Sequence, residues 1–140
     1  MWLWHLLVAY VKKGLSLGNL RNNLFLCEKN VFPIMKVDYQ TMSEQIKRNV
    51  HEVDANAQVW LYGSRVRGEA REDSDWDVLV LSPQDKLTFK EEEKFMDHIC
   101  ELMVQTGQTI QLFAYGMNDW HANHAITPFY KNVQSEAILL

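Results

Sequence analysis

The sequence predicts a small α/β fold, with helices flanking a sheet, in a single domain. Two capping boxes, which begin at Thr41 and Thr88, are each followed by apolar residues at helical spacing. Three segments rich in aliphatic and aromatic residues, at 57–62, 75–81 and 109–115, have the length and composition of strands. Of the 140 residues, 47% are hydrophobic and 23% are charged, so the chain can bury one core and is not expected to be disordered.

The first predicted elements are a helix, a strand, a loop and a second strand. We expect the helix over 41–53 and the strand over 57–62. Residues 63–68 form a loop that can include one helical turn. The end of the segment 75–81 is continuously apolar, which predicts a central strand buried on both faces.

The remaining elements alternate in the same way. The helix that begins at Thr88 runs to the region of Gln105, and Gly107 suits its C-terminal cap. After the third strand, 117–125 is a short polar segment. Pro128 is well placed in the first turn of a last helix, which we expect to run to the end of the chain.

Residues 1–34 differ in composition from residues 35–140. They contain four of the 14 basic residues and one of the 18 acidic residues. We therefore divide the chain here, and we expect natural synthesis to begin at Met35, which makes 1–34 an extension foreign to the native protein. The alternative is a genuine N-terminal helix that packs on the domain or on a second subunit.

Length, charge and cysteine content exclude several classes of protein. The apolar run 1–11 is too short to span a bilayer and lacks the features of a signal peptide. The net charge of −4 does not favour binding to extended duplex nucleic acid. Cys27 and Cys100 are few and far apart, which fits a reducing compartment, so we expect a cytoplasmic protein without a membrane segment.

The most informative stretch begins with a basic turn that contains glycine. Gly63 and Ser64 come directly after a predicted strand, and Arg65, Arg67 and Gly68 follow. Glycine lets backbone N–H groups approach phosphate oxygens closely, and arginine adds a charged fork. We predict that these five residues bind phosphate groups.

Ser74, Asp75 and Asp77 follow at the start of the next strand. Because side chains alternate along a strand, the two carboxylates point to one face and Trp76 points to the core. Two carboxylates at this spacing can share divalent cations with phosphates, and we expect Mg²⁺, with two ions when substrate is bound. Ser74 can cap the turn or orient Asp75, and we include it in the phosphate-binding set.

The ordered set from Gly63 to Val80 resembles the minimal nucleotidyltransferases of the DNA polymerase β superfamily. Their pattern is Gly-Ser, a spacer of about ten residues, and Asp-x-Asp before an apolar strand. Small bacterial members extend it to GSRxRGxA and SDxDxxV, which residues 63–70 and 74–80 match. The resemblance implies a nucleotidyltransferase-like α+β fold with a small mixed, twisted sheet, and it assigns catalysis and metal binding to Asp75 and Asp77.

The chain departs from this family pattern at one position. Active members usually carry a third carboxylate on the strand after the next helix, often as the base that activates the acceptor hydroxyl. The corresponding strand, 109–115, has no acid, and Gln111 lies where the third carboxylate is expected. Glutamine can position a hydroxyl or a water, but it cannot take the proton, so we expect Gln111 to join Asp75 and Asp77 in the catalytic set as a positioning group.

The resemblance implies two alternative functions. As an enzyme, the protein would bind Mg²⁺ and an NTP, with ATP expected, and transfer a nucleoside monophosphate to an acceptor hydroxyl with release of pyrophosphate. The acceptor would be a protein partner, such as a HEPN-type toxin, or a small molecule, held by a partner, by exposed loops or by a second copy in a homo-oligomer. Alternatively, the protein is a catalytically weakened nucleotide-binding partner, such as the antitoxin of a toxin–antitoxin pair.

Overall fold

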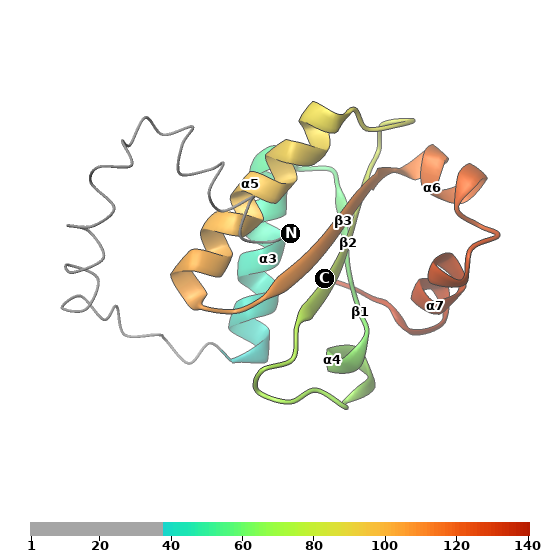
Figure 1. Ribbon diagram of the computed structural model, residues 1–140. Coiled ribbons are helices and arrows are strands. Elements are labelled where there is room, and N and C mark those ends of the chain that lie inside the picture. The colour runs from blue at the N-terminus through green and yellow to red at the C-terminus, as the bar shows by residue number, and fades with distance from the viewer. Residues whose placement is uncertain (1–37) are drawn as a thin grey trace, which may run out of the picture. The chain divides into compact units, whose positions relative to one another are not determined.

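The computed structural model describes residues 38–140, and the extension expected over 1–34 lies outside the described residues. The described helices and strands follow one another as α3 (Tyr39–Val53), β1 (Gln58–Tyr62), α4 (Ser64–Arg67), β2 (Trp76–Ser82), α5 (Phe89–Thr106), β3 (Ile110–Gly116), α6 (Met117–Asn123), α7 (Pro128–Glu136) and β4 (Ile138–Leu139). Figure 1 shows this arrangement. The alternation of helices and strands confirms the predicted α/β class.

The four strands of the described region form one mixed sheet in the order β3-β2-β1-β4. β1 runs antiparallel to both of its neighbours, β2 and β4. β2 and β3 run parallel, because α5 lies between them in the chain and returns it to the same edge. The expected mixed sheet is therefore confirmed.

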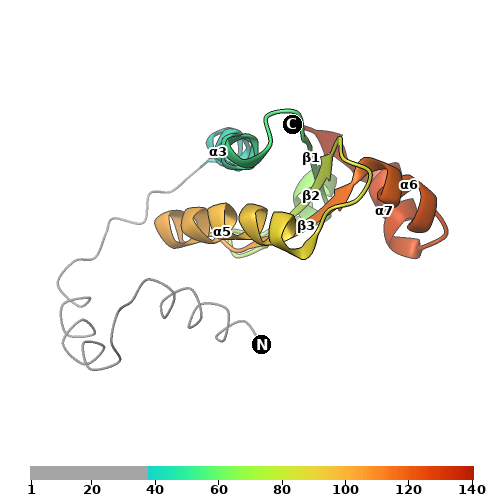
Figure 2. The same ribbon diagram turned by 90° about the horizontal axis from the view of Figure 1, so that it is seen from above.

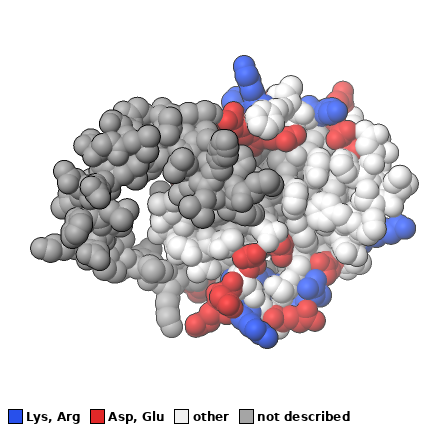
Figure 3. Space-filling model, in the orientation of Figure 1, with Lys and Arg blue, Asp and Glu red and all other residues white. Residues whose placement is uncertain are grey.

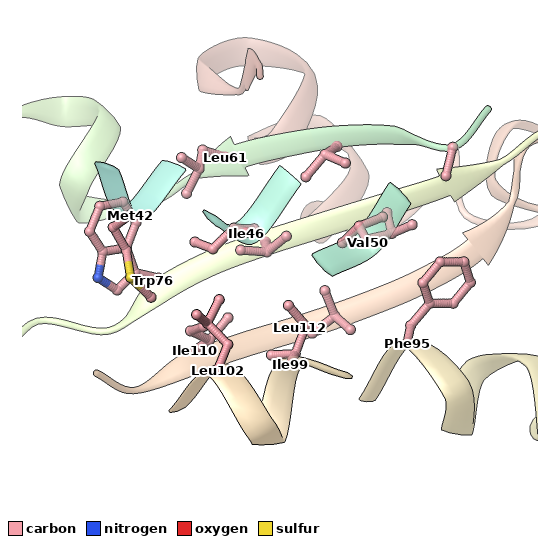
Figure 4. Packing of buried hydrophobic residues seen from close by; sticks show 14 of the residues in the cluster. Met42, Ile46, Val50, Leu61, Trp76, Phe95, Ile99, Leu102, Ile110 and Leu112 are labelled. Carbon is pink, nitrogen blue, oxygen red and sulfur yellow. The ribbon is translucent and has the colours of Figure 1, made fainter. Parts of the chain in front are cut away.

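Helices cover both faces of this sheet. α3 and α5 lie on one side, while α6 and α7 lie on the other (Figures 1 and 2). Along β2, Trp76, Val78 and Val80 belong to the core beneath α3 and α5, which Figure 4 shows from close by. Leu79 and Leu81 belong to the second core, beneath α6 and α7. The prediction that β2 is a central strand buried on both faces is thus confirmed.

The two long helices begin at different kinds of cap. Thr88 and Glu91 form the predicted capping box of α5, and Gly107 ends that helix in the left-handed conformation, with φ 69°. At α3 the prediction is wrong, because the N-cap is Asp38, whose carboxylate accepts a 3.0 Å hydrogen bond from the Thr41 backbone N–H. Thr41 instead lies inside the first turn, where its hydroxyl donates to Asp38 at 2.8 Å. A carboxylate at the N-cap outcompetes the threonine because it accepts both bonds.

The expected polar segment 117–125 contains a short helix, α6, that anchors the second core. Trp120 on α6 is fully buried and packs against rings of β3 and α7. Trp120 is the one buried residue of this seven-residue helix. Among residues 38–140, no helix combines the length and the apolar character needed to cross a bilayer.

The C-terminal residues differ from the prediction of a helix to the end of the chain. α7 ends at Glu136, and the next residues form β4, an edge strand that pairs with β1. In this pairing Trp60 lies opposite Leu139, and Leu61 lies opposite Ile138. A strand of two residues has no periodicity for a sequence pattern to detect, which explains the error.

Candidate active site

The turn after β1 has a conformation that requires glycine at its first position. Gly63 has φ 78° and ψ −157°, and a Cβ atom there would overlap Asp77 Oδ2 and lie 3.0 Å from Asp77 Cγ. Asp77 is close because Tyr62, the residue before Gly63, pairs with it across β1 and β2. The turn then forms α4, as the sequence allowed, and Gly68 ends it with φ 75° and an N–H bond to the Ser64 carbonyl.

The structure brings the three predicted catalytic residues together at one end of β2. Asp75 and Asp77 are both half-buried, and Trp76 between them is 2% exposed and points into the core. Gln111 lies beside Asp77 in the parallel register of β2 and β3. Its side-chain amide donates a 2.7 Å hydrogen bond to Asp75 Oδ2. Two acids and an amide therefore face the same space.

The electrostatic environment of Asp77 disfavours its charge. Burial raises the pKa of this carboxyl group above its ordinary value, and the neighbouring charge of Asp75 raises it further. Glu136 adds a smaller increase, while Arg67 and Arg65 act in the opposite direction. The two arginines therefore offset only part of the burial and repulsion that disfavour the charge of Asp77.

Arg65 braces the loop that leads into the acid pair. Its guanidinium lies 4.2 Å from the centre of the Trp76 ring, and burial lowers its pKa. It donates to the carbonyl oxygen of Asp75 at 3.3 Å and to that of Ser74. Ser74 caps the turn, because its hydroxyl accepts a 2.8 Å bond from the Arg71 backbone N–H. The hydrogen bonds of Arg65 and Ser74 therefore hold the loop before β2 in place.

Arg67 and Gly63 share a carboxylate that the sequence did not predict. Glu136, at the end of α7, accepts a 2.8 Å bond from the Gly63 backbone N–H through Oε1. Through Oε2 it accepts a 2.8 Å bond from Arg67, which also pairs with Glu69 at 2.9 Å. The bond from Arg67 is the main reason that the pKa of Glu136 is lowered. In Figure 3 charged side chains of both signs gather where Figure 1 places α4.

The position of Glu136 follows from the pairing of β4 with β1. Because β4 pairs antiparallel with β1 and Leu61 lies opposite Ile138, the residues just before β4 approach the end of β1, where the Glu136 carboxylate reaches Gly63. No local signal marks this acid, since 73 residues separate it from Gly63. Only knowledge of the β4 pairing would have identified it.

The chemistry of the acid pair fits a hard divalent cation. Asp75 and Asp77 offer carboxylate oxygens, the ligands that Mg²⁺ prefers, and Mg²⁺ usually binds one or two carboxylates together with waters and substrate phosphates. Residues 38–140 contain no group of three His, Cys, Asp or Glu side chains placed to hold a metal ion. Phosphate oxygens and water would therefore have to complete the coordination of a cation held by these two acids.

Comparison with known proteins shows to which family the chain belongs. A crystal structure described as a toxin–antitoxin with AMP-PNP shares the fold, with a TM-score of 0.52, 16% sequence identity, and coverage of 69% of this chain and 69% of that chain. No curated protein matches the sequence. The family model of the nucleotidyltransferase domain matches residues 42–125, which include the glycine turn 63–68, the acid pair and Gln111. The chain belongs to the nucleotidyltransferase domain family.

Proposed function

We propose that the protein binds an NTP together with Mg²⁺, with ATP as the first candidate, and transfers a nucleoside monophosphate to an acceptor hydroxyl. One observation carries this proposal: the carboxylate of Asp77 lies directly against Gly63, so a phosphate at the turn is adjacent to the acid pair. A triphosphate that spans this contact would have its negative charge beside the place where Asp75 and Asp77 can hold a cation. Such neutralisation and positioning are the main requirements of phosphoryl transfer.

Each residue has a defined task in this reaction. Asp75 and Asp77 would hold Mg²⁺, which when bound neutralises charge on the triphosphate, and the turn after Gly63 would orient its outer phosphates. The acceptor oxygen forms a bond to the α-phosphorus, the bond from that phosphorus to the bridging oxygen of the β-phosphate breaks, and pyrophosphate leaves. Gln111 cannot take the proton of the acceptor hydroxyl, so that proton must pass to water or to a group of the acceptor's own protein.

The second candidate function is a nucleotide-binding partner protein with little or no turnover. Gln111 favours this function, because its amide donates a hydrogen bond to the Asp75 carboxylate and cannot act as a base. A structural neighbour described as a toxin–antitoxin with AMP-PNP supports a protein partner, such as a toxin, as the acceptor or the binding target. We place the enzyme first because the acid pair and the glycine turn are both present.

Titration and turnover measurements separate the two candidates. We expect the protein to bind AMP-PNP in the presence of Mg²⁺ and to lose this binding in Asp75→Ala and Asp77→Ala while the fold survives. Asp73→Ala, which removes an exposed acid from the same loop, is the matched control and should bind normally. Pyrophosphate release from ATP with a toxin as acceptor identifies the enzyme, and binding without release identifies the partner protein. Full Mg²⁺-dependent affinity in Asp77→Ala would exclude this site.

A further inference from the structure

We propose that Glu136 is an internal competitor that holds the phosphate position of the turn until a nucleotide displaces it. This inference rests on the proposed function, because it concerns the same turn and the same ligand. It makes Glu136 a determinant of affinity and of ligand choice, in addition to the residues of the motif.

The contacts of Glu136 are those that a phosphate would make. One carboxylate oxygen accepts from the Gly63 backbone N–H and the other accepts from Arg67, both at 2.8 Å. A main-chain N–H in a glycine turn and an arginine guanidinium are both donors that commonly bind phosphate oxygens. A carboxylate and a phosphate cannot use the same N–H in the same geometry, so one must leave before the other binds.

The fold both delivers this carboxylate and lets it leave. β4 pairs with β1 directly after α7, and Glu136, the last residue of that helix, lies within hydrogen-bonding distance of the Gly63 backbone N–H. Glu136 is the last residue of α7, and its side chain is 19% exposed. Rotation about its side-chain bonds can therefore withdraw the carboxylate without breaking the sheet. Displacement therefore costs the two charge-assisted hydrogen bonds of Glu136 and leaves the packing of the domain unchanged.

The surrounding charges favour a metal-loaded polyphosphate as the ligand that displaces Glu136. The negative charges of Asp75 and Glu136 both raise the pKa of Asp77, so the three carboxylates repel one another and any further anion. A free anion that approaches the turn meets this repulsion, and Arg67 is already paired with Glu136 and Glu69. A polyphosphate with Mg²⁺ brings positive charge to Asp75 and Asp77, which turns their repulsion into attraction.

A role for Glu136 as a third metal ligand is less consistent with the geometry. Both of its carboxylate oxygens are engaged, one by Gly63 and one by Arg67. In the part of the chain that the structure describes, the acids do not form a three-ligand cluster. The two roles predict opposite results, because removal of a metal ligand weakens binding and removal of a competitor strengthens it.

Titration of AMP-PNP into charge-neutral variants tests the inference. A ligand's apparent affinity falls in proportion to the fraction of protein whose site is open, so we expect Glu136→Gln to bind AMP-PNP with Mg²⁺ roughly tenfold more tightly than the wild type. We expect a larger gain without Mg²⁺, because one of the repelling charges is gone. Glu69→Gln is the matched control: it removes the other partner of Arg67 but does not contact Gly63, and its affinity should stay within about twofold of the wild type.

The possible results distinguish failure of this inference from failure of the proposed function. Equal or weaker binding by both Glu136→Gln and Glu136→Ala, with thermal melts showing that they are folded, overturns the competitor role. If Asp77→Ala still abolishes binding in that case, the proposed function stands. An equal gain in Glu69→Gln also overturns the competitor role, because the effect would then come from the charge of Arg67. Absence of nucleotide binding in the wild type and in every variant overturns both proposals.

Discussion

The side-chain amide of Gln111 on β3 donates a 2.7 Å hydrogen bond to Asp75 Oδ2, at the start of β2. This bond places a neutral donor where a third carboxylate would add a repelling charge beside Asp75 and Asp77. The amide therefore stabilises the acid pair in the absence of a cation, at the expense of a group that could accept a proton. Stability and turnover make opposite demands on this position, and replacing Gln111 by glutamate separates them.

Replacing Gln111 by glutamate should make the domain dependent on a divalent cation. Three neighbouring carboxylates repel one another, so we expect Gln111→Glu to lower the Tm at pH 8 in buffer without divalent cations, and Mg²⁺ to restore it. Nucleotidyl transfer should increase, since a base now faces the acceptor. Thermal melts with and without Mg²⁺ and a pyrophosphate assay measure the two effects. Gln105→Glu, the same change at an exposed position of α5, is the control, and an equal loss of Tm there would contradict the argument.

Replacing Asp77 by asparagine should stabilise the fold at neutral pH. The folded-state pKa of Asp77 is raised above its ordinary value of 3.8, so the folded protein binds this proton more tightly than the unfolded chain does. The free energy of unfolding therefore falls as pH rises from 3.8 through the folded-state pKa. Asp77→Asn removes the penalty, and the gain is roughly 0.5 kcal/mol because the half-exposed carboxylate is screened by solvent. The gain should disappear below pH 3.8, where the carboxyl group is protonated in both states. Urea unfolding at pH 3.5 and pH 7 measures it, and an equal gain at both pH values would refute the explanation.

Alanine at Gly63 and at Gly68 should have different costs, although both glycines have positive φ. At Gly68 a Cβ atom would meet nothing within 4 Å, so Gly68→Ala carries only the conformational cost of about 1 kcal/mol. At Gly63 the Cβ atom would also overlap the Asp77 carboxylate, so we expect a cost about 1–3 kcal/mol greater. Urea unfolding of the two variants gives the comparison. Equal costs would mean that Asp77 moves away freely.

Removing the guanidinium of Arg65 should loosen the loop before β2. Arg65→Ala loses the contact with Trp76 and the bonds to the carbonyls of Ser74 and Asp75, for a cost of about 1–2 kcal/mol. Arg65→Lys should recover only part of this, because an ammonium group cannot form the planar fork. Arg71→Ala removes an exposed arginine from the same loop and is the control. Proteolysis of the loop, together with urea unfolding, measures the effect, and full stability in Arg65→Ala would argue for a role on the ligand alone.

The features that could be predicted from the sequence are those with a local chemical cause. The capping box at Thr88, the turn glycines and the two-sided burial of β2 each follow from residues close together in the chain. Asp38 was missed because two capping signals lie within one turn, and the sequence does not rank them. Glu136 was missed because its partner lies 73 residues away and is reached through a two-residue strand. The acid pair could thus be predicted, but Glu136, whose carboxylate binds the Gly63 turn, could not.

The stacking of Arg65 on Trp76 gives the protein an optical reporter. Indole emission responds to a nearby positive charge, and the guanidinium lies 4.2 Å from the ring while the same side chain tethers the loop that carries Asp75. Any rearrangement of that loop changes the surroundings of the fluorophore. The part of the emission change that Arg65→Ala removes would follow loop motion on the stopped-flow timescale without an attached dye.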